Sequence, residues 1–235
     1  MIIIENLYKH FGKNQVLNGV DLNISEGGVF AVLGPNGSGK TTLIKCVLGM
    51  VIPNKGNISV QGVSIKNNWA YRKDIDYLPQ IANFPGNLSV KELISMIKDL
   101  RNVSCNDQRL IKSFQLESFL DKKLGNLSGG TKQKVNLLLA FMVDSPLIIL
   151  DEPTSGLDPI ALINLKKLIR EEKANGKTIV ITSHIMSFVE EMADEIVFLL
   201  EGKVYFKGNI NTLKEQTMQQ NLEHAIATIL TQNNV

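Results

Sequence analysis

The sequence predicts an α/β protein, and three observations support this fold class. Strand-like and helical segments alternate along most of the chain. The apolar runs 147–150 and 179–181 show no polar alternation, which is typical of parallel strands covered on both faces. The stretch between Gln80 and Pro146 contains helical signals but none for strands. We therefore expect an α/β core interrupted by a helical insertion.

The strand signals divide the chain into an early antiparallel portion and a later parallel one. Turn-forming residues at 25–28 and 53–56 separate the early strands, as antiparallel neighbours require. We expect the core to span 1–80 and 146–235, with a helical subdomain over 81–145. The expected strands are 2–5, 20–24, 29–33, 58–61, 75–78, 147–150, 178–182, 195–200 and 204–206.

Helix boundaries are marked by capping residues. Ser89 and Glu92 form a capping box at the start of one helix, and Asp158 with Pro159 marks the start of another. Further helices are expected at 43–48, at 108–114 and after Ser128. An apolar stripe over 222–230 predicts a C-terminal helix, and packing onto the core is favoured over binding a partner.

Composition excludes several classes of protein. The 235 residues are 44% hydrophobic, enough for one substantial core. The formal net charge is only +2 and the charges are interspersed, so no nucleic-acid partner is expected. The longest apolar run, 137–143, is far shorter than the ~20 residues that span a bilayer. Two cysteines without a C-x-x-C pattern and three scattered histidines indicate neither a disulfide nor a zinc site.

A glycine-rich segment between the strand at 29–33 and a helix matches the phosphate-binding pattern G-x-x-x-x-G-K-[ST]. Backbone N–H groups of such a loop hold phosphate oxygens, and the helix that follows adds the positive end of its dipole. Lys40 is placed to reach the β- and γ-phosphates, and Thr41 is favoured over Thr42 as a Mg²⁺ ligand. The segment consists of Gly34, Pro35, Asn36, Gly37, Ser38, Gly39, Lys40, Thr41 and Thr42.

Two adjacent carboxylates follow the buried strand at 147–150. They are Asp151 and Glu152, and neighbouring side chains on a strand point in different directions. Asp151 could therefore face Mg²⁺ while Glu152 faces an attacking water. A strand that ends in solvated acids is the alternative, and the phosphate-binding loop in the same chain makes it less favoured.

Leu127, Ser128, Gly129 and Gly130 match the signature motif of the ATP-binding cassette family, which other phosphate-binding-loop folds lack. The motifs occur in the family's order, and the resemblance covers essentially the whole chain. It implies a P-loop NTPase with a RecA-like core, an N-terminal antiparallel β subdomain and an inserted α-helical subdomain. It also implies an ATPase with ATP and Mg²⁺ as cofactors.

The resemblance implies roles for individual residues near the nucleotide. Phe11 resembles the aromatic residue that stacks on adenine, with Tyr8 as the less favoured alternative. Gln80 resembles the loop glutamine that touches Mg²⁺ and senses the γ-phosphate. Glu152 resembles the general base, and His184 resembles the switch histidine that contacts the γ-phosphate. Together with Lys40, the last three would form the catalytic set.

Other residues resemble those that join two cassettes. Ser128, Gly129 and Gly130 resemble the donors to the γ-phosphate of nucleotide bound to a second cassette, and Asp158 resembles the residue that couples the two sites. The implied assembly is a homodimer with ATP between its copies. The family commonly has glutamine where this chain has Thr131, so the contact that glutamine would make is in doubt, although the other donors are intact.

A bare cassette of this kind resembles a transporter subunit that works with a separate integral-membrane permease. The chain would then be cytoplasmic and peripheral at the inner face of the membrane. In detail it resembles the ATPases of nitrous oxide reductase maturation. Two alternatives are a ribosome-associated factor and a nucleotide-gated clamp on DNA. The first usually carries two cassettes, and the second carries a long coiled coil, for which no sustained heptads are present.

Overall fold

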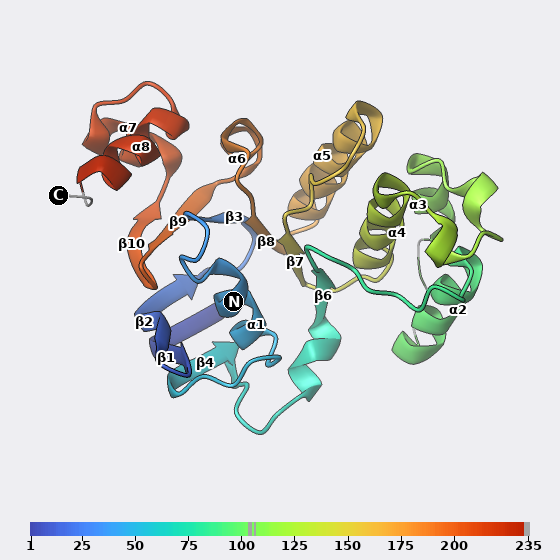
Figure 1. The fold of residues 1–235 in the computed structure, drawn as a ribbon, viewed down its shortest axis with the longest axis horizontal. Helices are drawn as coiled ribbons and strands as arrows, with labels where there is room; N and C mark the ends of the chain where they lie inside the picture. Colours follow the sequence, from blue (N-terminus) through green and yellow to red (C-terminus); the bar gives the residue numbers. More distant parts are fainter. Residues whose placement is uncertain (103–104, 106, 233–235) are drawn as a thin grey trace. The chain divides into compact units, whose positions relative to one another are not determined.

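The computed structural model describes residues 1–102, 105 and 107–232. It contains two compact units: unit 1 comprises Met1–Tyr71 and Val180–Val235, and unit 2 comprises Arg72–Ile179 (Figure 1). An antiparallel sheet, parallel strand pairs and intervening helices confirm the predicted α/β class. None of the helices in the described part of the chain has the length and apolar character needed to cross a bilayer.

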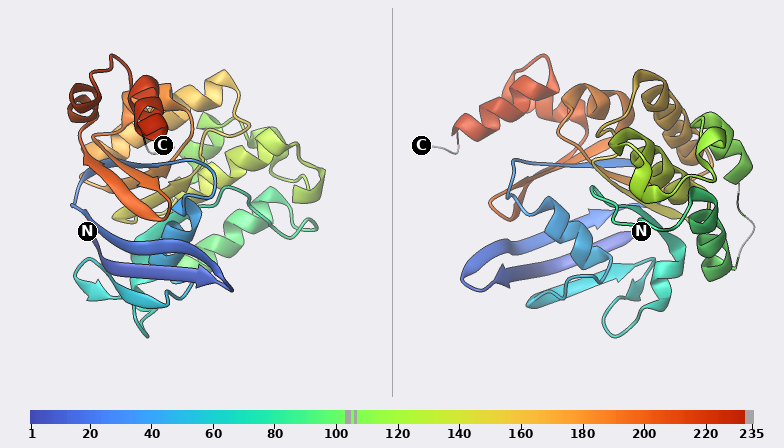
Figure 2. Two further views of the ribbon diagram at one scale, coloured as in Figure 1. Left: turned by 60° about the vertical axis from the view of Figure 1, so that its left-hand side comes forward. Right: turned by 45° about the vertical axis from the view of Figure 1, so that its right-hand side comes forward.

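The antiparallel sheet lies in unit 1, in the strand order β2-β1-β4-β5. Its β1 and β2 run side by side as long ribbons in both views of Figure 2. Both strands extend well beyond the predicted segments, because their pairing continues as far as Phe11 and Asn14 through mixed polar and apolar residues. The bounds are β1 Ile2–Phe11, β2 Asn14–Ile24, β4 Lys55–Val60 and β5 Val63–Ser64.

A second group of strands in unit 1 carries the glycine-rich loop. In it, β3 (Gly28–Leu33) pairs in parallel with β9 (Glu195–Leu200), and β9 pairs antiparallel with β10 (Lys203–Gly208). Nearly every residue of β3 is buried, as the apolar run predicts. The helix α1 (Lys40–Val47) begins directly after the loop that follows β3.

Three helices contribute side chains to one hydrophobic core of unit 1. They are α6 (Met186–Met192), α7 (Ile210–Thr217) and α8 (Leu222–Gln232). The predicted stripe of α8 is buried against side chains of β3 and β9, which confirms its packing onto the core. Figure 1 shows α7 and α8 next to each other beyond β10. The sequence reasoning marked neither α6 nor α7.

Unit 2 contains a parallel strand pair and a group of helices. The strands β6 (Ile75–Leu78) and β7 (Leu147–Asp151) pair in register, and β8 (Thr178–Thr182) carries the chain from unit 2 into unit 1. The other elements are η1 Ala70–Asp74, α2 Val90–Arg101, α3 Asp107–Ser113, η2 Glu117–Phe119, η3 Leu124–Asn126, α4 Gly129–Phe141 and α5 Pro159–Ala174.

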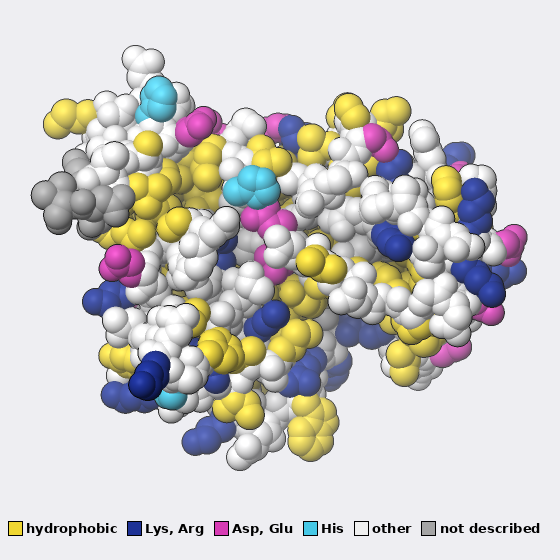
Figure 3. Space-filling model, viewed as in Figure 1, with side chains coloured by type: hydrophobic (Ala, Val, Ile, Leu, Met, Phe, Trp, Pro, Cys, Tyr) yellow, Lys and Arg dark blue, Asp and Glu magenta, His cyan; other side chains and the backbone are white. Residues whose placement is uncertain are grey.

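The predicted caps of unit 2 are confirmed. Ser89 and Glu92 form a reciprocal capping box at α2, and the Asp158 carboxylate accepts the Ala161 N–H at the start of α5. Gly176, with φ at +82°, follows the end of α5. Over α2–α4, on the face shown in Figure 3, positive and negative side chains are interspersed.

A buried carboxylate in β6 makes the stability of unit 2 depend on pH. Burial raises the pKa of Asp76 to about 6, although Arg101 and Ser145 hydrogen-bond with that side chain and act in the opposite direction. The folded state therefore keeps a proton between about pH 4 and pH 6 that the unfolded state has lost, so this contribution to stability falls as pH rises through that range.

We expect the Asp76→Asn variant to lack this pH dependence. The free energy of unfolding of the wild type, minus that of the variant, should decrease by about 2 kcal/mol between pH 4 and pH 7. This is less than the full equivalent of the pKa shift, because the unfolded carboxyl is already partly ionised at pH 4. Denaturant titrations of both proteins at several pH values measure this difference. A difference that stays constant with pH would show that Asp76 does not titrate in this range.

Candidate functional site

The glycine-rich loop of unit 1 has the backbone shape that its sequence predicts. Gly34, Gly37 and Gly39 have φ angles of +149°, +82° and +104°, which residues with a side chain rarely adopt. A Cβ atom on Gly34 would lie 2.2 Å from the carbonyl oxygen of Leu199. The first position of the motif therefore requires glycine for space as well as for conformation.

The side chains of the loop offer groups that suit phosphate. The Lys40 ammonium donates to the carbonyl oxygens of Gly34 at 2.7 Å and Pro35 at 3.0 Å, which holds its positive charge at the loop. The Ser38 hydroxyl is buried and has no hydrogen-bond partner among the described residues. Buried polar groups are normally satisfied, and a phosphate oxygen would satisfy this one. Thr41 and Thr42 are half-buried in the first turn of α1.

Unit 1 also contains Phe11 and His184, two of the other predicted site residues. Phe11 ends β1 with 50% of its surface exposed, and the Lys9 ammonium lies 4.7 Å from the centre of its ring. Tyr8 is less exposed than Phe11, and its hydroxyl lies against Gly19. Phe11 thus has more open aromatic surface for stacking. His184 is exposed between β8 and α6, after the buried Ser183, whose hydroxyl accepts the Ile185 N–H.

In unit 2, the predicted carboxylates lie at the carboxyl end of β7. Asp151 is 2% exposed and Glu152 is 8% exposed. Glu152 has φ at +52°, a conformation that is uncommon for a residue other than glycine and that costs free energy. Such a conformation is kept only where the surroundings enforce it. The positive φ means that the backbone leaves the extended conformation of β7 at Glu152.

The neighbouring strand brings Gln80 to the same edge. Leu78 of β6 pairs with Leu150 of β7, so the residues that follow both strands leave the sheet at one edge. Gln80 is exposed there, and the preceding Pro79 accepts a hydrogen bond from the buried Asn136 of α4. Burial, with a smaller contribution from the charge of Asp151, raises the pKa of Tyr77 to about 12.

The signature residues form the amino-terminal turn of α4. Ser128 caps this helix by accepting the Thr131 N–H, and Ser128 and Gly129 are exposed. The first turn of α4 contains no acidic residue, so its positive end is not neutralised by its own side chains. A Cβ atom on Gly129 would meet nothing within 4 Å. This turn therefore presents N–H groups and a hydroxyl to an incoming anion.

Contacts along α4 fasten it to the loop that follows Glu152. A Cβ atom on Gly130 would lie 2.8 Å from the carbonyl oxygen of Gly156, so the two backbones are in close contact. The buried Gln133 amide donates to the Pro153 carbonyl at 3.2 Å. Lys134 forms an ion pair with Asp158 at 2.6 Å and, with the Ala161 N–H, lowers the pKa of that carboxyl. We call these three contacts the α4 brace.

The sequence reasoning did not identify Gln133, Lys134 or Asn136 as part of this region. Gln133 and Asn136 are polar residues on the otherwise apolar inner face of α4, three positions apart. A polar side chain within an apolar stripe of a helix needs a hydrogen-bond partner once it is buried. The sequence could therefore have indicated that Gln133 and Asn136 bond to neighbouring segments.

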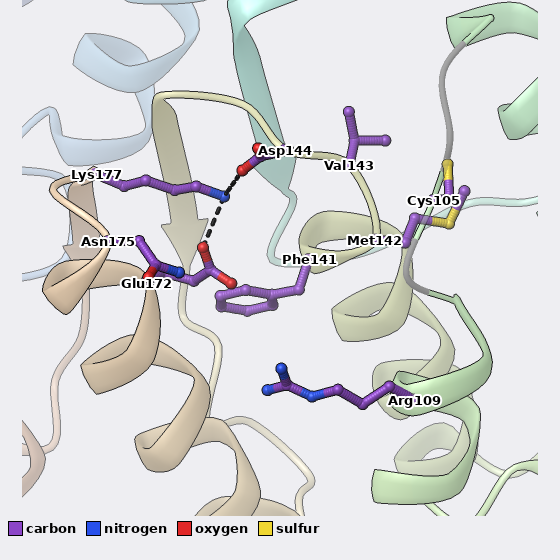
Figure 4. Close-up of a pocket in the computed structure, with 9 residues that line it drawn as sticks. All are labelled: Cys105, Arg109, Phe141, Met142, Val143, Asp144, Glu172, Asn175 and Lys177. Carbon is purple, nitrogen blue, oxygen red and sulfur yellow. Dashed lines mark ion pairs between the residues drawn. The ribbon is translucent and has the colours of Figure 1, made fainter.

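A hollow elsewhere in unit 2 has a volume of about 430 Å³. Figure 4 shows Lys177 pointing toward Asp144 and Glu172, with which it forms ion pairs at 2.7 and 2.6 Å. Burial opposes the charge of Lys177, but hydrogen bonds to these two carboxylates raise its pKa overall. Arg109 also lines the hollow and is paired with Glu171. None of the predicted site residues is among the described residues that line it.

Comparisons with known proteins agree with these motifs. The family model described as ABC transporter matches residues 17–155. The lantibiotic transport ATP-binding protein SrtF of Streptococcus pyogenes is 36% identical over 227 residues, which cover 95% of this chain and 94% of that protein. The Nod factor export ATP-binding protein I of Rhizobium sp. (strain N33) is 34% identical, covering 92% of this chain and 73% of that one.

Solved structures give the same result. A structure of an ATP-binding subunit of an ABC transporter matches with a TM-score of 0.90 at 30% identity, covering 97% of this chain and 98% of that chain. A dimeric post-hydrolysis state of an ATP-binding cassette, bound to ADP and Pi, matches with a TM-score of 0.77 at 26% identity, covering 89% and 98%.

Proposed function

Because the chain belongs to the ABC transporter family and is an ATP-hydrolysing domain of it, we propose that two copies bind ATP between them and drive a separate membrane permease. The observation that carries this proposal is the presence of two phosphate-binding helix termini in one chain. One is the loop before α1 in unit 1, and the other is the Ser128 turn before α4 in unit 2. Each nucleotide would use the first from one copy and the second from the other.

The loop before α1 binds the β- and γ-phosphates. Its N–H groups and the Lys40 ammonium neutralise phosphate charge, and the buried Ser38 hydroxyl gains a partner. Phe11 stacks on the adenine ring. Mg²⁺ would neutralise further phosphate charge, with Thr41, Gln80 and Asp151 as the protein's oxygen ligands and phosphate oxygens as the others. Hydroxyl, amide and carboxylate oxygens suit this ion.

Hydrolysis needs a positioned water and charge neutralisation, and little covalent help from the protein. Glu152 accepts the proton of the attacking water, a task worth roughly 10²–10⁴-fold in rate. The backbone strain at Glu152 supports this role, because unfavourable conformations cluster at functional residues. Gln80 and His184 contact the γ-phosphate region, and Ser128, Gly129 and Gly130 donate to that phosphate from the second copy. Asp158 couples the two sites.

A homodimer of this kind is tested by its response to nucleotide. We expect small-angle scattering with a non-hydrolysable ATP analogue and Mg²⁺ to show a dimer, and the nucleotide-free protein to be a monomer. The Ser128→Asp variant is a matched control, since aspartate caps helices as well as serine but repels phosphate. It should bind the analogue and stay monomeric. An analogue-bound wild-type monomer would contradict the proposal.

The membrane partner is supported by the relatives, whose names describe lantibiotic transport and Nod factor export. We propose an integral-membrane permease as the partner, which would hold the chain at the inner face of the cell membrane. Purification from cells under mild detergent should recover a permease with the tagged chain. Recovery of ribosomes or DNA instead would favour the alternative of a non-transport ABC ATPase. The nitrous oxide reductase subgroup stays a prediction.

A further inference from the structure

We propose that Thr131 is a positioning residue for the proposed ATP dimer, because its hydroxyl makes the Ser128 hydroxyl a donor to the γ-phosphate. The inference rests on the proposed function, since the phosphate belongs to nucleotide held by a second copy. It assigns a purpose to the threonine that stands where the family commonly has glutamine.

The geometry of the first turn of α4 supplies the contacts. The Ser128 oxygen accepts the Thr131 N–H at 3.2 Å, and the Thr131 hydroxyl oxygen lies 2.8 Å from the same Ser128 oxygen. Ser128 is exposed, whereas Thr131 is half-buried. The exposed hydroxyl is therefore held from its inner side by two groups of one residue.

The hydrogen-bonding capacity of a hydroxyl then fixes the direction of the proton. A serine hydroxyl has one donor and two acceptor lone pairs. When the Thr131 N–H and O–H both donate to Ser128, both lone pairs are used and the serine proton remains available. A phosphate oxygen only accepts, so an approaching phosphate selects this arrangement. Donation by Thr131 also polarises the serine O–H and strengthens its bond to the anion.

The capping box of α2 shows the opposite arrangement in the same chain. Ser89 occupies the same helix position as Ser128, and Glu92 the same position as Thr131. The Ser89 hydroxyl donates to the Glu92 carboxylate at 2.8 Å, which can only accept. The proton of Ser89 is thus used inside the box, and a negative charge stands beside it. A threonine at the third position of α4 avoids both effects.

The surroundings keep this pair in place. The α4 brace holds Gly130 against Gly156 and Lys134 against Asp158, so the first turn of α4 is fastened directly behind Ser128. With no acidic residue in that turn, the field at the Ser128 proton favours an anion. Only the orientation of the Ser128 O–H bond then remains to be set, and Thr131 sets it.

The test measures the ATP concentration that gives half-maximal dimerisation, by light scattering, in a Glu152→Gln background that preserves bound ATP. Thr131→Val keeps the branched shape but removes the hydroxyl, and should raise this concentration roughly tenfold, as expected for one hydrogen bond to a charged group. Thr131→Ser should restore it to within about twofold, while Thr131→Glu should raise it roughly a hundredfold by recreating the α2 arrangement next to phosphate.

Two further measurements separate positioning from folding. ATP binding to the monomer, measured with a fluorescent analogue at low protein concentration, should be the same in all four proteins, because the α1 loop is unchanged. Thr228→Val, at a half-buried position of α8 in unit 1, controls for the substitution itself. Thr131→Ala replaces the valine variant if the valine variant unfolds at a lower temperature than the other proteins.

The outcomes distinguish this inference from the proposed function. Dimerisation of the valine and alanine variants at the same ATP concentration as the protein with Thr131 would overturn the role of Thr131 and leave the dimer intact. Absence of an ATP-dependent dimer even with Thr131 present would overturn both.

Discussion

The Glu152→Gln variant should bind ATP as tightly as the wild type while its turnover falls by roughly 10²–10⁴-fold, the usual contribution of a general base. Glutamine has the same shape and can occupy the same buried position at the end of β7, but its amide does not accept a proton from water. Nucleotide affinity should persist because the α1 loop is untouched. ATP then stays intact between two copies, so the variant should accumulate as an ATP-bound dimer.

Steady-state phosphate release and size-exclusion chromatography with ATP measure the two effects. A matched control is Glu201→Gln, because Glu201 is an exposed glutamate that also has a positive φ, at +49°. It lies in the turn before β10, and its replacement should leave turnover unchanged. If Glu152→Gln turned over near the wild-type rate, Glu152 would not be the base.

Replacement of Lys40 by alanine should weaken ATP binding by roughly 10²–10⁴-fold and abolish measurable turnover at moderate ATP concentrations. The estimate follows from the loss of two hydrogen bonds between a charged donor and charged phosphate oxygens, each worth about 1.5–3 kcal/mol. In the structure, the ammonium donates to two carbonyl oxygens of the loop, so it is already directed toward the loop before nucleotide arrives.

Isothermal titration with ATP and Mg²⁺ gives the dissociation constant directly. Lys45→Ala is the control, since Lys45 is exposed on the same helix α1 but near its other end. Lys40→Arg should recover only part of the affinity, because a planar guanidinium does not fit a site shaped for a compact ammonium. A Lys40→Ala protein with nearly unchanged affinity would exclude the proposed role of the loop.

The elements that the sequence predicted well are those with a strong local signal. The bounds of β8 and β9 are as expected, because each strand contains an apolar run and polar residues mark where that run begins and ends. The capping box of α2 and the Asp158 cap of α5 are local interactions between residues three positions apart. The short helices α6 and α7 were missed, since each buries only two or three side chains and has little periodicity to detect.

In the candidate site too, some features could be predicted from local sequence and others depend on packing. The two motifs that contain Lys40 and Ser128 are each continuous in sequence, so the sequence alone was enough to propose them as binding residues. The positive φ of Glu152 and the Lys134–Asp158 ion pair depend on how α4 packs on the following loop, which no local pattern encodes. The contact between Ser128 and Thr131 was within reach of sequence reasoning, because a threonine three residues after a serine cap can bond to it.

The α4 brace has a consequence for the timing of hydrolysis. In the proposed dimer, the serine turn of each copy senses its neighbour's γ-phosphate, and the brace joins that turn to the chain that leaves the copy's own Glu152. Loss of phosphate from one nucleotide site would then be transmitted through the α4 brace to the catalytic glutamate of the other nucleotide site. The two chemical events would influence each other, and rates plotted against ATP concentration should be sigmoidal.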